Sequence, residues 1–76
     1  MVYSFIDLAF DVLKAATQPL TYQEIWQAGQ QAGLASRLRT AGKTPWNTLG
    51  AQLYVDVRDN DSSRFVKIGK NPARFF

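Results

Sequence analysis

Amide and hydroxyl side chains recur at helical spacing in the segment GKTPWNTLGAQLYVDVR, residues 42–58. When the segment is stepped at about 100° per residue, Trp46, Leu49, Leu53 and Val57 fall within a narrow apolar arc, with Tyr54 at its border. The side chains roughly opposite are mostly small or polar: Thr44, Asn47, Thr48, Ala51, Val55 and Arg58. The pattern predicts a helix with one face for a core and a second face of small and polar side chains.

The second face has the chemistry needed to read base edges. A carboxamide such as that of Asn47 or Gln52 can pair bidentately with adenine, and small methyl-bearing residues can contact the methyl of thymine or 5-methylcytosine. The candidate readers are Thr44, Asn47, Thr48, Ala51 and Gln52. Two simpler explanations stay open: the face is an ordinary solvated surface, and Thr44 before Pro45 is accounted for by helix capping.

Positive charge is concentrated in the second half of the chain. Residues 1–36 hold one lysine against three acidic residues, a net charge of −2, whereas residues 37–76 hold eight Lys/Arg against three Asp, a net charge of +5. This excess favours a polyanionic partner, nucleic acid before an anionic membrane. The candidate phosphate ligands are Arg37, Arg39, Lys43, Arg58, Arg64, Lys67, Lys70 and Arg74. We expect about half to reach phosphate, because residues three apart on a strand point to opposite faces. A basic surface kept for solubility is the alternative.

The composition removes most catalytic and metal-binding chemistry. Without Cys or His, the chain lacks Cys/His zinc sites, Ser/His and Cys/His nucleophile pairs and histidine acid–base catalysis. Asp59 and Asp61 flank Asn60 in a segment typical of a turn, without the pattern of a calcium loop. We therefore expect a non-enzymatic domain with no cofactor, metal site or small-molecule substrate.

The length of 76 residues suits one domain with a single small core. No run approaches the roughly 18 apolar residues of a membrane span, and the first residues lack the order of a signal peptide. We expect a single domain over residues 1–76, excised from a longer protein because two terminal aromatics are an unusual natural end. A cytoplasmic location is expected, with nucleoid association in a bacterium, or a nuclear location in a eukaryote.

Start and stop signals place two helices before residue 42. Ser4 and Asp7 fit a capping box that precedes an apolar run at helical spacing as far as residue 16. Thr21 and Glu24 form a second capping box, and Gly33 is a suitable left-handed stop. The second helix is therefore expected over residues 22–32.

A connector and a hairpin complete the chain. Residues 34–43, LASRLRTAGK, are expected to form a brief strand or an extended connector. The runs RFVKIG and RFF flank the turn GKNPA and predict a β-hairpin of residues 64–69 with 73–76. The order helix, helix, short strand, helix, hairpin is that of a winged helix-turn-helix domain. The expected fold class is α+β, mainly helical, with three helices and a small β-hairpin wing.

Most aromatic residues occupy apolar positions typical of a core: Phe5, Phe10, Tyr22, Trp46, Tyr54, Phe65 and Phe75. Trp26 is the exception, since it falls toward the polar side of the second helix near Gln23 and Gln30. We expect it to be partly exposed and to mark a contact with other domains of a parent protein. A protein-interaction module that uses Trp26 and the second helix, or the third helix, is therefore the alternative to DNA binding.

The chain resembles the HARE-type winged helix-turn-helix family over nearly its whole length. That family takes its name from a homeobox-associated protein, the additional sex combs-like chromatin proteins and restriction endonucleases, and the N-terminal domain of the bacterial RNA polymerase delta subunit is a relative. The motifs that carry the resemblance are PLTYQEI, GKTP, SRFVKIG and the body TLGAQLYVDV. In that body Leu53, Tyr54 and Asp56 match the family's Leu-Tyr-x-Asp pattern.

The resemblance implies an accessory module of larger proteins that is not itself catalytic. The roles it implies are double-stranded DNA binding and, in restriction systems, sensing of modified bases. It is also compatible with protein contacts in transcription or restriction complexes. We expect the third helix, about residues 45–57, to face the major groove while the basic wing contacts phosphates, and a fused effector such as a restriction endonuclease to be targeted.

Overall fold

The computed structural model describes residues 3–38, 43–70 and 72–76, which form three helices, a short 3-10 turn and a two-stranded hairpin. Helix α1 spans Phe5–Ala15, α2 spans Tyr22–Gln31 and α3 spans Pro45–Asp59. The 3-10 helix η1 covers Ala35–Arg37, and the strands β1 and β2 cover Lys67–Ile68 and Arg74–Phe75. This mainly helical α+β fold is consistent with a winged helix domain, as expected.

The first two helices begin at the predicted capping boxes. The Ser4 hydroxyl accepts from the Asp7 N–H at 3.1 Å, and the Asp7 carboxylate accepts from the Ser4 N–H at 3.0 Å. Thr21 and Glu24 make the same reciprocal pair at 3.2 and 2.9 Å. Such boxes satisfy backbone donors that have no partner inside a helix, so the start of each helix is determined locally.

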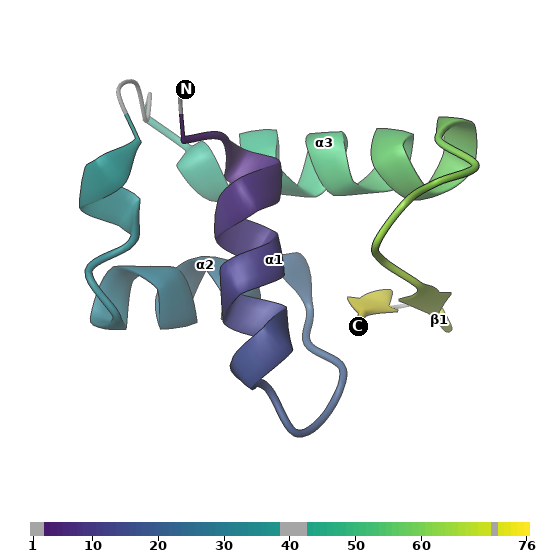
Figure 1. Ribbon diagram of the computed structural model, residues 1–76, viewed down its shortest axis with the longest axis horizontal. Helices are drawn as coiled ribbons and strands as arrows, with labels where there is room; N and C mark the ends of the chain where they lie inside the picture. The colour runs from purple at the N-terminus through teal and green to yellow at the C-terminus, as the bar shows by residue number, and fades with distance from the viewer. Residues whose placement is uncertain (1–2, 39–42, 71) are drawn as a thin grey trace.

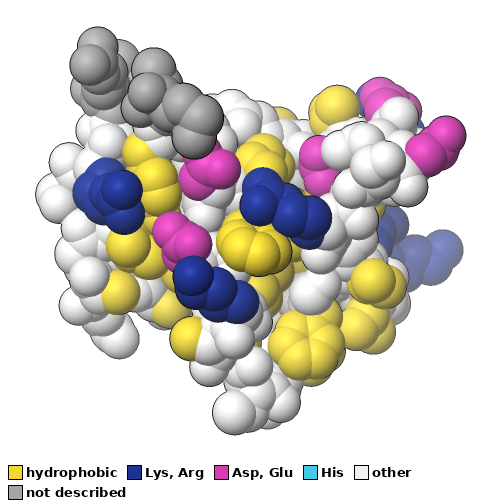
Figure 2. Space-filling model, in the orientation of Figure 1, with side chains coloured by type: hydrophobic (Ala, Val, Ile, Leu, Met, Phe, Trp, Pro, Cys, Tyr) yellow, Lys and Arg dark blue, Asp and Glu magenta, His cyan; other side chains and the backbone are white. Residues whose placement is uncertain are grey.

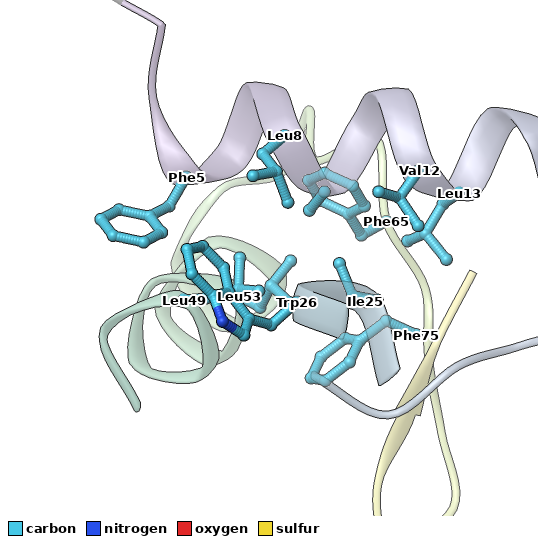
Figure 3. Packing of buried hydrophobic residues seen from close by; sticks show 11 residues of the cluster. Phe5, Leu8, Val12, Leu13, Ile25, Trp26, Leu49, Leu53, Phe65 and Phe75 are labelled. Atoms are coloured by element: carbon cyan, nitrogen blue, oxygen red, sulfur yellow. The ribbon is translucent and has the colours of Figure 1, made fainter. Parts of the chain in front are cut away.

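The three helices pack pairwise, with α1 crossing α2 and α3 (Figure 1). The core cluster consists of Phe5, Leu8, Ala9, Val12, Leu13, Ile25, Trp26, Leu49, Leu53, Phe65 and Phe75. Figure 3 shows the α1 side chains of this cluster pointing toward those of α2 and α3. Helix α2 lies against α1 so closely that a Cβ at Gly29 would be 2.9 Å from Leu8 Cδ2. The backbone of α2 can approach α1 this closely because residue 29 has no side chain.

The hairpin is held to the helices through Phe75. Lys67 pairs with Phe75 and Ile68 with Arg74 in antiparallel register, and Phe75 also forms a bridge with Leu20, between α1 and α2. The Phe75 ring is fully buried, and it meets the Tyr54 ring edge-on at a centroid distance of 5.4 Å. One residue therefore ties the hairpin to the α1–α2 connection and to α3.

Two predicted boundaries were wrong. The connector expected as a strand or extended segment forms η1, in which the Ser36 hydroxyl donates to the Gly33 carbonyl at 2.8 Å and the Arg37 N–H to the Leu34 carbonyl at 3.0 Å. These local bonds close a tight turn directly after α2, because Gly33 takes the predicted left-handed φ of 78°. Helix α2 itself ends at Gln31, one residue early, and Ala32 is its C-cap.

The two tryptophans exchange their predicted places. Trp26 was expected to be partly exposed, but it is only 5% exposed and packs against Phe5 at a ring-centroid distance of 6.2 Å. Trp46 was expected in the core, but it is 36% exposed. The reason is that α2 lies between α1 and α3 and buries both flanks of its apolar stripe, so its wider arc takes in Trp26. The first turn of α3 buries Pro45 in place of Trp46.

Candidate nucleic-acid interface

The outward face of α3 presents the predicted readers to solvent. Asn47, Thr48, Ala51 and Gln52 are all exposed, and the buried residues of the helix, Pro45, Leu49, Gly50 and Leu53, lie on its other side. Stepping the sequence at the helical angle predicts this division, because every residue of a regular helix has a fixed direction. We call the exposed set of Asn47, Thr48, Ala51, Gln52 and Val55 the outward face of α3.

Thr44 is the N-cap of α3, but its side chain makes no capping hydrogen bond. Its φ and ψ of −130° and 67° differ from the extended values at Ser4 and Thr21, so its hydroxyl is not aimed at the first-turn N–H groups. The Thr44 carbonyl instead accepts from the Asn47 N–H at 3.0 Å. Capping by the hydroxyl therefore does not account for this exposed threonine.

A groove of about 540 Å³ lies between the second half of α3 and the hairpin. Its lining residues are Tyr54, Val57, Arg58, Phe65, Val66 and Lys67. The ammonium nitrogen of Lys67 lies 5.3 Å from the centre of the Tyr54 ring, which holds this cation beside α3. The groove is continuous with the outward face of α3, since Tyr54 and Arg58 are next to it on the helix.

Arg58 is partly neutralised by its neighbour Asp59. Its Nε and Nη2 donate to the two Asp59 oxygens at 2.9 and 3.0 Å. These hydrogen bonds lower the pKa of Asp59 and raise that of Arg58. Both side chains are largely exposed, so the pair is weak and a phosphate can compete for the guanidinium.

Two predicted phosphate ligands lie on a different surface. The Arg37 guanidinium stacks over the Tyr3 ring at 4.3 Å, and that of Arg64 stacks over the Phe10 ring at 4.2 Å. Arg64 also lies 3.8 Å from Asp7. Figure 2 shows the surface over α1, where basic and acidic side chains alternate among hydrophobic ones. Acidic neighbours and stacking make this α1 surface a poor phosphate site.

The remaining basic candidates divide between two sides of the hairpin. Lys43 and Lys70 are exposed at the start of α3 and in the hairpin turn. Arg74 is opposite Ile68 in the register, so it points to the other side of the hairpin from Lys67. Its charge helps to lower the pKa of Glu24, although the backbone hydrogen bond from Thr21 is the larger cause. Arg39 lies outside the described residues.

Two exposed residues complete the surface without having been chosen as readers. Val55 is 48% exposed on the outward face of α3, and Tyr54 is 39% exposed beside the groove. Helical stepping already set Val55 opposite the apolar arc, so that signal was present in the sequence. The exposure of Tyr54 could not be read there, because it depends on how far the hairpin covers α3.

A second cleft of about 510 Å³ separates α2 from the start of α3. It is lined by Gln23, Trp26, Gln27, Gln30 and Trp46. Its lining carries amides and indoles but no charge. The exposed flank of Trp46 belongs to this cleft and not to the outward face of α3.

The carboxylates support loop structure. Asp56 accepts hydrogen bonds from the Asn60 amide at 3.1 Å and from the Ser63 hydroxyl, and Asn60 Oδ1 accepts from the Ser62 N–H at 3.0 Å. This is the Asx-type turn predicted for the segment after α3. Over residues 3–38, 43–70 and 72–76, no three metal-binding side chains cluster, and no helix has the length and apolar character to cross a membrane.

The family model of the HARE-HTH domain, described as an ASXL and restriction endonuclease HTH domain, matches residues 3–74. The chain belongs to the HARE-HTH family. The match runs from the residue before the first N-cap to the last strand, so it covers the whole HARE-HTH fold, including the hairpin. Searches of curated proteins and of solved structures found no match.

Membership in this helix-turn-helix family indicates DNA as the partner of the HARE-HTH domain. In helix-turn-helix domains the second helix of the motif lies in the major groove with its first residues at the base edges. The corresponding helix of this chain is α3, because the Gly33 turn and η1 connect it to α2.

Proposed function

We propose that this domain binds double-stranded DNA with the outward face of α3 in the major groove. The observation that carries the proposal is the position of the basic residues around that face. Lys43 precedes it, Arg58 follows it, and Lys67 borders the groove that continues from it. Phosphates flank both sides of a major groove, so cations at both ends of a neutral reading face suit a duplex.

In this arrangement Asn47 and Gln52 read base edges, Thr48, Ala51 and Val55 contact methyl groups, and Thr44 lies at the groove edge. Lys43, Arg58, Lys67 and Lys70 neutralise phosphates. Arg37 and Arg64 take no part, because they are stacked on the α1 surface. Arg74 contributes at most at long range, since it points away from the groove.

The domain has no catalytic role of its own and targets a fused effector, of which a restriction endonuclease is one example. The methyl-sized contacts of Ala51 and Val55 support recognition of thymine or of a methylated cytosine. Location at the nucleoid or in the nucleus follows from the DNA partner.

A titration of labelled duplex at several salt concentrations tests the proposal. With about four phosphates neutralised, the slope of log K against log salt is expected to be roughly −4. Lys43→Ala should weaken all sequences alike and reduce the slope by about 1, whereas Asn47→Ala should change the sequence preference. Absence of binding at about 100 μM protein and about 50 mM salt would overturn the proposal.

A protein-interaction role is the second candidate, and one observation favours it. Trp46 exposes 36% of its surface in the uncharged cleft beside the α2 glutamines, and exposed tryptophans are enriched at protein contacts. Trp26 cannot serve as the contact residue because it is buried. If a partner uses this cleft, Trp46→Ala should abolish that contact and leave DNA affinity unchanged.

A further inference from the structure

Strand β1 forms an open edge of the hairpin sheet. Within the part of the chain that the structure describes, β1 pairs with β2 alone, while β2 is also bridged to Leu20 on its other side. The N–H and C=O of Phe75 bond with Leu20 at 2.7 and 3.0 Å, so they point away from β1. Because Lys67 is opposite Phe75 in an antiparallel ladder, the N–H and C=O of Lys67 point outward.

The neighbouring residues are already satisfied, which isolates this one outward pair. The N–H and C=O of Val66 bond with those of Phe76 at 3.1 and 3.0 Å. Ladder alternation gives Ile68 the same inward bonding toward Arg74. A further strand would therefore dock through the backbone of Lys67.

The side of the hairpin that faces away from α3 carries an unusual amount of exposed apolar surface. Val66 is 62% exposed, Ile68 44% and Phe76 46%. Val66 and Ile68 are two apart on one strand, and Phe76 is opposite Val66, so all three share one side of the sheet. We call these three residues the outer apolar strip. It ends beside a recess of about 220 Å³ that Phe76 forms with Phe10 and Leu13 of α1.

Charge decides between the possible occupants of this edge. Residues 64–70 carry Arg64, Lys67 and Lys70 and no acidic residue, and Arg74 lies across the ladder from Ile68. A second copy docking antiparallel on β1 would bring like charges together, which is destabilising and is a known protection against self-pairing. An added strand with carboxylates would instead gain from the same lysines.

We propose that β1 binds an extended peptide segment of alternating apolar and acidic residues, which adds as a strand next to Lys67. The peptide's apolar side chains cover the outer apolar strip, and its carboxylates lie near Lys67 and Lys70. Backbone hydrogen bonds supply the affinity and the alternating side chains the specificity, as in other strand-addition complexes. This peptide contact is separate from DNA reading by α3 and goes beyond the proposed function.

A short synthetic peptide in which valine alternates with glutamate is the probe. It is titrated to about 1 mM into the isotopically labelled domain without DNA, and backbone amide signals and hydrogen exchange are followed by NMR. Saturable binding with new protection of the Lys67 amide is expected, while the amides of Val66 and Ile68 are already protected. No shift at about 1 mM, or shifts confined to the Trp46 cleft or the α1 surface, would overturn the proposal.

Peptide and protein variants separate the contributions. A peptide with the same residues in two blocks, or with lysine replacing glutamate, should not bind. Ile68→Ser should weaken binding about tenfold, and Lys67→Glu should weaken it by at least a similar factor. Val55→Ser is the matched control, since it removes an equally exposed aliphatic side chain from α3. Equal losses for Val55→Ser and Ile68→Ser would contradict the assignment.

Two further measurements keep the outcomes distinct. Sedimentation of the free domain at rising concentration should show a monomer, because a dimer abolished by Lys67→Glu or Ile68→Ser would make a second copy the occupant and overturn the peptide proposal. The duplex titration is run separately. A domain that binds DNA but no peptide loses only this inference, and one that binds peptide but no DNA loses only the proposed function.

Discussion

The guanidinium of Arg64 lies 4.2 Å from the centre of the Phe10 ring, so this arginine of the hairpin arm belongs to the surface of α1. Arg37 has the same relationship with Tyr3 at 4.3 Å. Both were predicted to contact phosphate from their charge and position in the sequence. The stacking separates the basic residues into a set around α3 and a set on α1, and the two sets have different expected effects when they are changed.

Arg64→Ala should leave duplex affinity and its salt slope unchanged and reduce stability. The expected loss is about 0.5–1 kcal/mol, the size of an exposed cation–π contact. Lys67→Ala is the matched comparison from the same segment and should weaken duplex binding. Paired DNA titrations and denaturant unfolding of the two variants check this, and a lower DNA affinity for Arg64→Ala would show that the α1 surface contacts DNA.

Gly29→Ala should destabilise the domain although alanine is the better helix former. The added Cβ would lie 2.9 Å from Leu8 Cδ2, and Leu8 is fully buried, so α2 must shift from α1 or Leu8 must repack. Overpacking costs about 1–3 kcal/mol, against a gain of about 1 kcal/mol in helix propensity. Urea unfolding should therefore show a net loss of up to about 2 kcal/mol, and a net gain would mean that the packing relaxes freely.

Phe75→Ala should abolish the packing of the hairpin against α3. The ring is fully buried and meets Tyr54 edge-on, and removal of a buried phenylalanine costs about 3–5 kcal/mol. In a domain of this size that is a large share of the total stability. Thermal unfolding by circular dichroism measures the loss. Phe76→Ala is the control with the same side chain, 46% exposed, and should change stability far less.

Tyr3→Phe should alter the stability profile at both ends of the pH range. Burial and the 2.6 Å bond to Asp11 raise the pKa of Tyr3 to about 12, and that bond lowers the pKa of Asp11 below 3.8. The Tyr3 contribution is present below the unfolded value near 10 and is lost as the pH rises toward 12. The Asp11 contribution is present above 3.8 and is lost as the pH falls through the lowered pKa.

The variant should therefore lose less stability than the parent between pH 10 and 12 and on acidification below 3.8. Denaturant midpoints measured against pH test this. The pKa of Asp11 in the variant, followed by carboxyl carbon NMR, should move up toward its ordinary value. An unchanged Asp11 pKa would show that the Tyr3 hydroxyl does not hold the carboxylate.

The two tryptophans should differ in fluorescence quenching. Trp46, which is 36% exposed, should be quenched by acrylamide in the folded state, and Trp26, which is 5% exposed, should not. Trp46→Phe leaves only the buried indole, so the remaining emission should be blue-shifted and poorly quenched. Efficient quenching of that variant would restore the original expectation for Trp26.

Local signals predicted most of the secondary structure correctly. Both capping boxes, the Gly33 stop and the hairpin are interactions between residues a few positions apart, and such interactions are determined by the order of residues alone. The register of the outward face of α3 was equally predictable, because a helix fixes the direction of each side chain. The family resemblance rested on the same segments and was confirmed over residues 3–74.

The structure of the connector and the burial of the tryptophans required the tertiary arrangement. Residues 35–37 could form a strand or a turn, and docking of α2 against its neighbours places the turn there. Periodicity gives the direction of a side chain but not how wide an arc its neighbours cover. It therefore could not show that α2, packed between two helices, buries Trp26 and leaves Trp46 exposed.

By itself the sequence determined the helices, their caps, the hairpin and the neutral reading face, because each depends on chain-local geometry. Only the tertiary structure decided which cations accompany that face. Arg37 and Arg64 are equivalent to Lys43 and Lys67 in charge, but long flexible side chains settle on whichever aromatic or acidic neighbour the fold brings near. That neighbour comes from α1, far away in the sequence, and the interface is therefore a property of the packed domain.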